Sequence, residues 1–566
     1  MEYDLKIAGG TLVDGTGAPA RPGDVGIRGG RLVAVGDAPG AAARTIDARG
    51  HAVAPGFVDI HTHYDAQVLW DRMLTISPWH GVTTAVMGNC GFGIAPTLAA
   101  HRGLVLRTLE RVEGMCLAAL EAGLGDDWGF ETFPEYLDAI DRRGTAINLA
   151  AFVGHTPLRL HVLGEEATER AATPDEVARM RSLVAEAMAA GAIGFATSKS
   201  PTHVGFGGRP VPSRAADVAE IVELARGLAR SERGVVQATT GPGFFLDELA
   251  EVARASGRPV TWTALLSGVY GENGHRPILA KTRDLARAGL TVVPQVTGRP
   301  LLFDFDFGEP FLLESFPFFA DVSRADREGK KAIYRDPGFR ARFRAETAPS
   351  ASGRLAGRWN RTWISVCPTE RALEERLVAD VARERGADAV DLVLDLALAS
   401  DLALRLRMAV ANLDEREVGE LLQEPAAVLG LSDAGAHASQ LCDACFATDL
   451  LARWVREKRV LTLERAVHML TARPAELLGI SDRGRLAEGL AADVVVLDPD
   501  AVAAGPLRRV RDLPAGADRL VSDAIGIRAV VVNGRIVRED GRDAVDPDGP
   551  LPGRLLRGGR ARAADH

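Results

Sequence analysis

The chain has 566 residues, 46% of them hydrophobic, which is enough to bury a large core and excludes a disordered chain or a disulfide-stapled mini-protein. The formal net charge of −9 argues against a nucleic-acid-binding surface. The five cysteines form an odd, sparse set, and the sequence has neither a signal-peptide pattern nor a run of about 20 apolar residues. We therefore expect a cytoplasmic protein with no membrane or nucleic-acid partner; a homo-oligomer stays possible.

Both ends of the chain have the pattern of a small β domain. The first 50 residues are short alternating runs broken by glycine, and a similar pattern returns at 484–502 and 527–542. There, VVVNGRIV predicts a hairpin with Asn533 and Gly534 at its turn. We expect one composite β-sandwich from residues 1–54 and 481–545, and a flexible tail over 546–566, rather than a nucleic-acid-binding arm.

The middle of the chain alternates between apolar β-branched runs and amphipathic helices. The eight runs are 53–63, 81–90, 146–155, 191–200, 234–241, 259–268, 290–298 and 426–437, and two clear helices are 175–191 and 215–231. Strands buried on both faces and alternating with helices are typical of parallel α/β folds. We predict a (β/α)8 TIM-like barrel over 55–480, because eight units with polar strand ends favour it over an open doubly wound sheet.

One connection, at about 299–425, is abnormally long, and its first half is aromatic and charged. An insertion after a barrel strand lies on the catalytic face, so we expect a lid-like segment that covers the site. Its phenylalanines have two interpretations, an apolar pocket wall or the insert's own small core. They are Phe303, Phe305, Phe307 and Phe311.

Two histidines end the first apolar run, in GFVDIHTHYD. Residues i and i+2 of a strand share a face, so His61 and His63 offer two imidazoles to one cation, and neutral imidazole suits zinc. Asp433 ends the eighth run and adds a carboxylate. The C-terminal strand ends of a barrel form its active face, so these three side chains predict a metal site there.

Other polar residues follow the strand ends, and we consider each for substrate binding. They are His155, Lys199, His203, Arg209, Gln237, Gln295 and His437. For His155 we expect either a supporting hydrogen-bonded role or contact with the substrate. For His203 and Arg209 we expect contact with a substrate anion. Lys199 is either an ordinary cation near the substrate or the insert, or a carbamylated metal bridge. Cys442 and Cys445 form C-x-x-C, a redox or zinc pair or, by the simpler interpretation, two structural thiols.

The strings PGFVDIHTHYD, SDAG and TARPAELLGISDRGRLAEGLAADVVVLD resemble the amidohydrolase superfamily of metal-dependent hydrolases over nearly the whole chain. The string GVTTAVMGNCGFGIAP and the long insert are similar to its N-acyl-D-amino-acid deacylase branch. The resemblance implies that His61, His63 and Cys90 bind metal and that Asp433 both binds metal and acts as general base.

The same resemblance implies two further histidines, at the ends of strands five and six, and this sequence lacks them. Strand five carries Gln237 instead, strand six has no histidine, and His275 falls in a loop. We therefore expect about one zinc ion per chain, since three protein ligands and an open position suit a catalytic zinc. Hydrolysis of a C–N bond in a small N-acyl or cyclic amide is the main functional prediction. Its alternatives are another metal-assisted reaction on this fold, or a catalytically silent relative.

Overall fold

A computed structural model describes residues 2–205, 208–229, 231–310, 312–314, 316–350, 355 and 357–561. Its central sheet has eight parallel strands, one in each predicted apolar run. In chain order they are β6 (Phe57–Asp59), β7 (Val82–Met87), β8 (Asn148–Gly154), β9 (Gly194–Ser198), β10 (Val235–Thr239), β11 (Val260–Thr263), β12 (Val292–Val296) and β16 (Val428–Leu429). A bridge between Thr62 and Ala434 joins the first strand end to the last. The sheet therefore closes, which confirms the barrel and excludes the open sheet.

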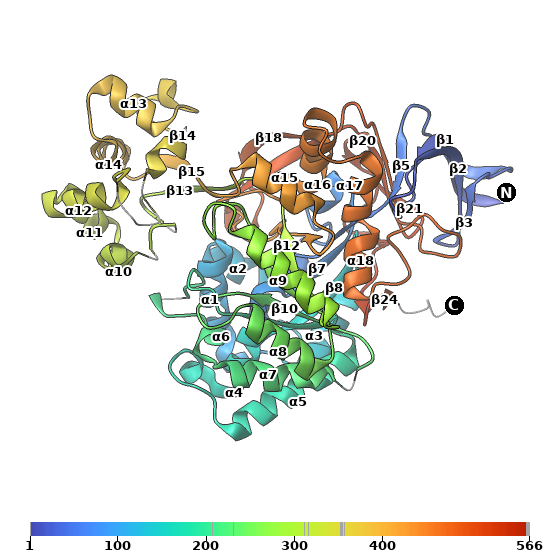
Figure 1. Ribbon diagram of the computed structural model, residues 1–566, viewed down its shortest axis with the longest axis horizontal. Helices are drawn as coiled ribbons and strands as arrows, with labels where there is room; N and C mark the ends of the chain where they lie inside the picture. Colours follow the sequence, from blue (N-terminus) through green and yellow to red (C-terminus); the bar gives the residue numbers. More distant parts are fainter. Residues whose placement is uncertain are drawn as a thin grey trace.

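Helices connect the strands and surround the sheet (Figure 1). They are α1 (Arg102–Glu113), α2 (Leu117–Leu124), α3 (Phe133–Arg143), α4 (His155–Leu163), α5 (Pro174–Ala190), α6 (Pro212–Ala215), α7 (Val218–Ala225), α8 (Leu246–Ser256), α9 (His275–Arg287), α15 (Glu415–Gln423), α16 (Phe446–Asp449), α17 (Leu463–Leu470) and α18 (Ala472–Leu478). Helix α5 shows how the sequence sets their limits: Thr173 and Glu176 form a capping box, and Gly191 ends the helix with φ 112°. Within the described part of the chain, no helix is long and apolar enough to cross a bilayer.

Strands from both chain ends form one nine-stranded sheet, which confirms the expected small β domain. They are β1 (Tyr3–Leu12), β2 (Arg21–Arg28), β3 (Arg31–Gly36), β4 (Ala42–Asp47), β5 (Ala52–Pro55), β17 (Val494–Leu497), β20 (Ile527–Val532), β21 (Arg535–Glu539) and β22 (Arg542–Asp543). Asn533 and Gly534 connect β20 to β21 with φ of 45° and 81°, as the hairpin prediction requires. Strand β5 pairs with β17 and leads directly into β6, so this sheet adjoins the barrel.

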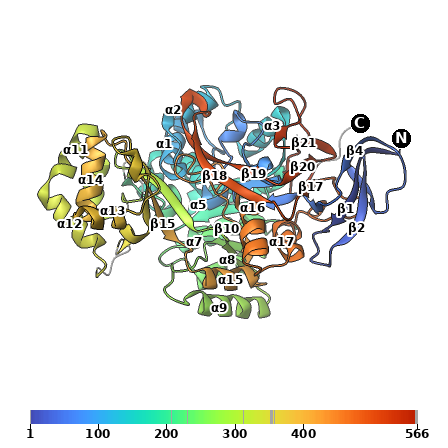
Figure 2. The same ribbon diagram turned by 90° about the horizontal axis from the view of Figure 1, so that it is seen from above.

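The insert forms a separate lobe with its own core. Its elements are β13 (Leu301–Asp306), α10 (Ala320–Arg324), α11 (Arg327–Arg335), α12 (Pro337–Thr347), β14 (Thr362–Val366), α13 (Val378–Arg385), α14 (Ala389–Ala399) and β15 (Arg405–Ala411). Figures 1 and 2 show these helices to one side of the barrel, opposite the small β domain. Phe305 and Phe307 belong to the core of the lobe, whereas Phe303 meets the His437 ring edge-on at 5.2 Å. Phe311 lies outside the described residues.

The last part of the chain corrects the expectation of a flexible tail. Leu555 and Leu556 are buried, and the amide of Leu149 on β8 donates to the carbonyl of Arg554 at 2.9 Å. The short strands β23 (Leu556–Arg557) and β24 (Arg560–Ala561) follow, and Arg557 pairs with two aspartates of α3. The segment packs because Leu556 joins the apolar cluster of the barrel strands and Leu555 joins the main core, while Arg557 forms ion pairs.

Candidate metal centre

The two histidines of the H-x-H motif lie together just past the end of β6. His61 and His63 are buried, 1% and 7% exposed, and their ring centroids are 5.3 Å apart. The backbone of the loop after β16 holds this segment, since the amide of His63 donates to the carbonyl of Ala434 at 2.7 Å. The amide of Asp433 donates to the carbonyl of His61 at 3.1 Å. Barrel closure therefore brings the first and eighth strand ends, and their polar side chains, to one place.

Cys90 and Asp433 complete this group of donors. The Cys90 Sγ lies 3.4 Å from His61 Nε2, and Asp433 Oδ1 lies 3.3 Å from the same nitrogen and 3.8 Å from His63 Nε2. Potential ligand atoms of the two histidines and the cysteine all fall within 4.8 Å of one another. Cys90 and Asp433 both have positive φ, 58° and 46°, a strained conformation that clusters at functional sites.

The chemistry of these donors fits a cation. Two imidazoles, a thiol and a carboxylate are the ligand types that zinc takes in proteins. Burial opposes ionisation of the Cys90 thiol, but the imidazoles of His61 and His63 outweigh burial and lower its pKa to about 7. A thiol with this pKa is readily deprotonated, which is the form that binds a metal. His61, His63, Cys90 and Asp433 are therefore the residues that could hold an ion.

Two glutamines support the donors from behind. Gln295 Oε1 lies 2.8 Å from His61 Nδ1 and, as an acceptor, fixes the proton on that nitrogen. His61 Nε2 is then left as the basic atom facing Cys90 and Asp433. Gln237 Oε1 accepts from the backbone amide of Cys90 at 2.6 Å. The two residues thus orient His61 and Cys90, a role that the sequence pattern did not predict for them.

His155 lies in a buried hydrogen-bonded cluster under the strand ends. Its Nδ1 meets Thr197 Oγ1 at 2.8 Å, and its Nε2 meets Glu220 Oε1 at 2.9 Å. Arg159 pairs with the same carboxylate. Burial would raise the pKa of Glu220, yet His155 and Arg159 lower it to about 2. Of the two interpretations of His155, this geometry fits hydrogen-bonded support and does not fit substrate contact.

The remaining candidates divide into two groups. His203 lies beside the metal centre, because the Phe92 ring packs tilted against it, with ring centroids 5.0 Å apart, and against His63 at 6.2 Å. Burial and, after it, the neighbouring His437 lower the pKa of His203 to about 3. His437 Nδ1 meets Gln440 Oε1 at 3.1 Å. Lys199 and Arg209 point elsewhere.

Lys199 Nζ donates to the carbonyls of Arg214 and Ala216 at 2.7 and 2.5 Å, at the C-terminal end of α6. Arg209 is exposed and pairs with Glu169 at 3.2 Å. Neither geometry fits the expected contact with a substrate anion. The reason is local: backbone carbonyls and a surface carboxylate lie within reach of these flexible cations.

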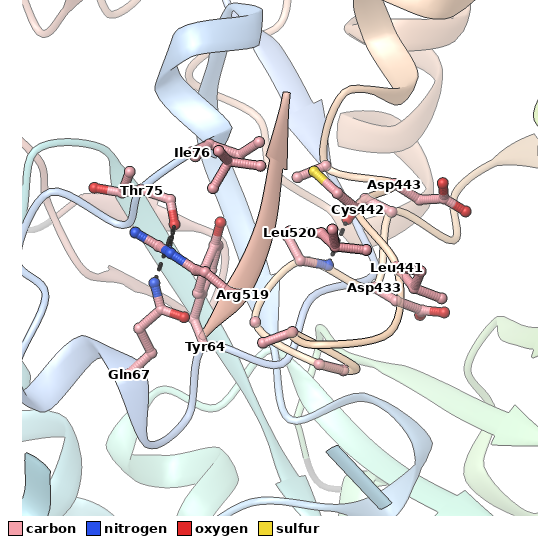
Figure 3. A pocket seen from close by; sticks show the side chains of 17 residues that line it. Tyr64, Gln67, Thr75, Ile76, Asp433, Leu441, Cys442, Asp443, Arg519 and Leu520 are labelled. Atoms are coloured by element: carbon pink, nitrogen blue, oxygen red, sulfur yellow. Dashed lines mark hydrogen bonds between the residues drawn. The ribbon is translucent and has the colours of Figure 1, made fainter. Parts of the chain in front are cut away.

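A small cavity lies behind the loop that carries Asp433 (Figure 3). It is about 30 Å³ in volume, room for one or two waters but not for a substrate. Gln67 and Arg519 both donate to the carbonyl of Thr75 at its far side, at 3.1 and 2.8 Å. Cys442 lines the same cavity, and Cys445 Sγ donates to the Cys442 carbonyl at 3.2 Å. The geometry fits the interpretation of C-x-x-C as buried structural thiols.

Sequence reasoning missed three residues of this region. Glu220 lies on α7, in the helical connection between β9 and β10 and not at a strand end. Asp59 accepts from the amide of His61 at 3.2 Å, and burial raises its pKa to about 7. Phe92 connects His63 to His203 through its ring. The string VDIHTH contained a signal for Asp59, since that carboxylate is two residues before the first histidine, and Phe92 stands in the quoted string GVTTAVMGNCGFGIAP. Glu220 had no such signal.

A closed parallel barrel with imidazoles, a thiol and a carboxylate at its C-terminal strand ends defines the class of (β/α)8 metal-dependent hydrolases. The Amidohydrolase family model matches residues 44–538, and the chain belongs to that family. It is 31% identical over 544 residues to the D-aminoacylase of Alcaligenes xylosoxydans xylosoxydans, with 95% of each chain covered. It is 33% identical over 566 residues to the N-acyl-D-glutamate deacylase of the same organism, with 98% and 97% covered.

Solved structures agree with these sequence matches. An N-acyl-D-glutamate deacylase from Bordetella bronchiseptica, complexed with zinc and a phosphonate inhibitor that mimics the tetrahedral intermediate, has a TM-score of 0.68 and 28% identity, covering 98% of this chain and 100% of that one. A D-hydantoinase has a TM-score of 0.51 at 14% identity, which shows the fold alone. The predicted membership of the D-aminoacylase-like branch is confirmed.

Proposed function

We propose that this amidohydrolase cleaves the amide C–N bond of a small N-acyl or cyclic amide substrate, with one zinc ion per chain held by His61, His63, Cys90 and Asp433. The convergence of these four side chains carries the proposal. The relatives' names, D-aminoacylase and N-acyl-D-glutamate deacylase, point to amide substrates. The five free cysteines are consistent with a reducing cytoplasm as the location.

A divalent cation held by His61, His63, Cys90 and Asp433 would supply Lewis acidity, which would polarise a substrate carbonyl and lower the pKa of water toward about 7. Asp433 is the general base of the proposal: its carboxylate takes a proton from the attacking water and returns it to the leaving nitrogen. Gln295 keeps His61 in the tautomer whose Nε2 faces the centre. Gln237 keeps Cys90 turned inward through its backbone amide.

The single-ion stoichiometry rests on the strand ends that lack imidazoles. Strand β10 places Gln237 at this centre, and its carboxamide oxygen is already used by the Cys90 amide at 2.6 Å. Strand β11 ends with Thr263, whose hydroxyl donates to Thr239 at 3.1 Å. Amide and hydroxyl oxygens are poor zinc ligands, and these two have protein partners. The chain therefore provides ligands for one metal position, formed by a thiolate, two imidazoles and a carboxylate.

The test combines metal content with turnover. We expect about one zinc per chain in protein purified without added metal, and its loss in His61→Ala. Asp433→Asn should lower kcat on any amide substrate by about 10²- to 10⁴-fold, because a general acid–base contributes that much. Asp37→Asn, at an exposed position of the small β domain, is the matched control. Wild-type turnover by Asp433→Asn, or the absence of metal under all conditions, would contradict the proposal.

A further inference from the structure

The loop that carries Asp433 has a backbone conformation that needs support from its surroundings. Between β16 and α16, Asp433 and His437 have positive φ of 46° and 49°, and Leu431 just before them has φ 66°. Residues other than glycine adopt this left-handed conformation only at a cost, and they keep it where surrounding groups hold them. The contacts that hold this loop therefore decide where the Asp433 carboxylate lies.

Two carbonyls further along this loop accept hydrogen bonds from elements outside the barrel sheet. The carbonyl of Ala438 accepts from the amide of Leu520 at 2.8 Å, on β19 (Arg519–Ile525). The carbonyl of Gln440 accepts from the amide of Asp304 at 2.7 Å, on strand β13 of the lobe. The loop is thus held by the lobe and by β19 as well as by the barrel.

Two arginines contact the carbonyl that lies between these two in the chain, that of Ser439. Arg405, on β15 of the lobe, donates to it at 3.2 Å, and Arg509 donates through both Nη atoms at 3.0 Å. Arg509 lies on β18 (Ala503–Val510), the strand that pairs with β19. The carboxylate of Asp304 connects the two guanidinium groups, because its Oδ1 accepts from Arg405 Nε, and from Arg509 Nη2 at 2.9 Å.

The charge of Asp304 makes this arrangement possible. Asp304 is 4% exposed, and its other oxygen, Oδ2, accepts from the hydroxyl of Ser365 on β14. The side chains of Arg405 and Arg509 are also largely buried, 17% and 23% exposed. Two cations that share one carbonyl repel each other, and partly buried charges are screened little by salt. The carboxylate between them offsets this repulsion, so both arginines can reach Ser439 at once.

Both arginines have a second carboxylate partner. Arg405 also pairs with Asp306, and Arg509 also pairs with Asp518, each at 2.7 Å. Without the charge of Asp304, each arginine can move toward its second partner and away from the loop, so that neither cation is left buried and unpaired. The lobe keeps its own apolar core in that case. Loss of this one charge should therefore release the loop without unfolding the lobe.

We propose that Asp304 is a positioning residue for the metal centre. By holding the two arginines on the Ser439 carbonyl, it fixes the loop that presents Asp433 to the other donors. The two strands that connect the lobe to the barrel, β13 and β15, carry Asp304 and Arg405, so the position of the lobe and the geometry of the centre are coupled. The proposal rests on the proposed function and extends it to the support of the general base.

Hydrogen exchange of the full chain as purified is the first test, and it needs no turnover. We expect Asp304→Asn to exchange the amides of residues 436–441 about 2- to 30-fold faster than wild type, the range for loss of a coupling contact. The amides of α8 should exchange as in wild type, which excludes general destabilisation. Unchanged exchange of the loop in this variant would overturn the proposal.

Asp391→Asn is the matched control. Asp391 also pairs with two arginines of the lobe, Arg340 at 3.2 Å and Arg344 at 2.8 Å, and all three residues lie on helices α12 and α14. This variant should leave exchange of residues 436–441 unchanged. Equal acceleration in Asp391→Asn and Asp304→Asn would show that any loosening of the lobe has this effect, and would also overturn the proposal.

The second test measures the metal centre. In competition with a chelator, Asp304→Asn should bind zinc about 2- to 30-fold more weakly, and kcat on an amide substrate should fall by a similar factor while KM changes less than about twofold. Faster loop exchange with wild-type zinc affinity would overturn the positioning role. If the wild type binds no zinc or hydrolyses no amide, the proposed function fails, and loop exchange still decides whether Asp304 holds the loop.

A double variant separates this route from a general structural role. Asp304→Asn and Arg509→Met remove two members of one group of contacts, so their effects on loop exchange and zinc affinity should not add. The double variant should lie within about twofold of the more affected single variant. Effects that multiply would overturn the route through the arginines. Arg509→Met lies outside the lobe and should accelerate loop exchange by itself, so it provides the same test if Asp304→Asn does not fold.

Discussion

Replacing Gln295 by methionine tests how the chain orients its metal ligand. The carboxamide of Gln295 is the 2.8 Å acceptor for His61 Nδ1, and both side chains are 0–1% exposed. Methionine keeps the length and packing of the side chain but cannot accept this bond well, so a buried N–H loses its partner at a cost of about 1–3 kcal/mol. Loss of such a supporting contact typically weakens metal binding by about 10- to 100-fold, which is about 1.4–2.8 kcal/mol. The cost of the lost hydrogen bond and the expected loss of zinc-binding free energy therefore have the same magnitude.

The assay is competition for zinc with a chromophoric chelator, together with thermal unfolding of the metal-free protein. We expect Gln295→Met to bind zinc about 10- to 100-fold more weakly while the overall fold is retained. The control is Gln423→Met, an exposed glutamine of α15 whose side chain bonds only to a backbone carbonyl of its own helix. An affinity within twofold of wild type for Gln295→Met would show that the tautomer of His61 does not depend on this contact.

Three further predictions concern stability and the chain end. Burial lowers the pKa of His80 from 6.5 to about 4, so its imidazole is neutral in the folded protein near neutral pH. The contribution of the neutral His80 to the free energy of unfolding is therefore full above pH 6.5 and is lost as the pH falls toward 4. The 2.5-unit difference corresponds to about 3 kcal/mol; His80→Gln should flatten the urea-unfolding free energy over that range, and an unchanged pH slope would refute this. Glu220→Gln should destabilise by about 3 kcal/mol in the same assay at pH 7, because Arg159 and His155 lose a buried charged partner; a loss under about 0.5 kcal/mol would contradict the ion-pair geometry. Deleting residues 553–566 should cost about 3–6 kcal/mol through exposure of Leu555 and Leu556, whereas deleting only 562–566 is the control; equal stability of the two truncations would contradict the packing of this segment.

The sequence predicted what depends on local pattern. Eight apolar runs became eight parallel strands, and the i, i+2 spacing placed His61 and His63 on one side. The end of the chain was predicted wrongly because Leu555 is buried against β8, about 400 positions earlier, and nothing in its own composition shows this. We expected Lys199 to face the substrate, but the residue type does not show where a side chain points. In the structure its ammonium group points to the carbonyls of Arg214 and Ala216.

Gln237 shows the same limit at the metal centre. The sequence correctly showed a glutamine where the family has the histidine of strand five. The hydrogen bond that Gln237 accepts from the Cys90 amide, 147 residues away along the chain, forms only because folding brings β10 beside the turn after β7. Residues that orient others are therefore the hardest to find from a single sequence. Such residues belong to no sequence motif; folding only has to bring them within hydrogen-bonding distance of the residue that they orient.

The small β domain places a constraint on how the protein is made. Strand β5 has its partner β17 at Val494–Leu497, about 440 residues later in the chain. At a synthesis rate of about 5–20 residues per second, β5 leaves the ribosome roughly 20–90 s before that partner exists. During this interval an apolar strand edge is exposed to other chains, the condition under which nascent proteins aggregate. Productive folding of this enzyme therefore calls for a holding chaperone, or for slow closure of the small domain after release.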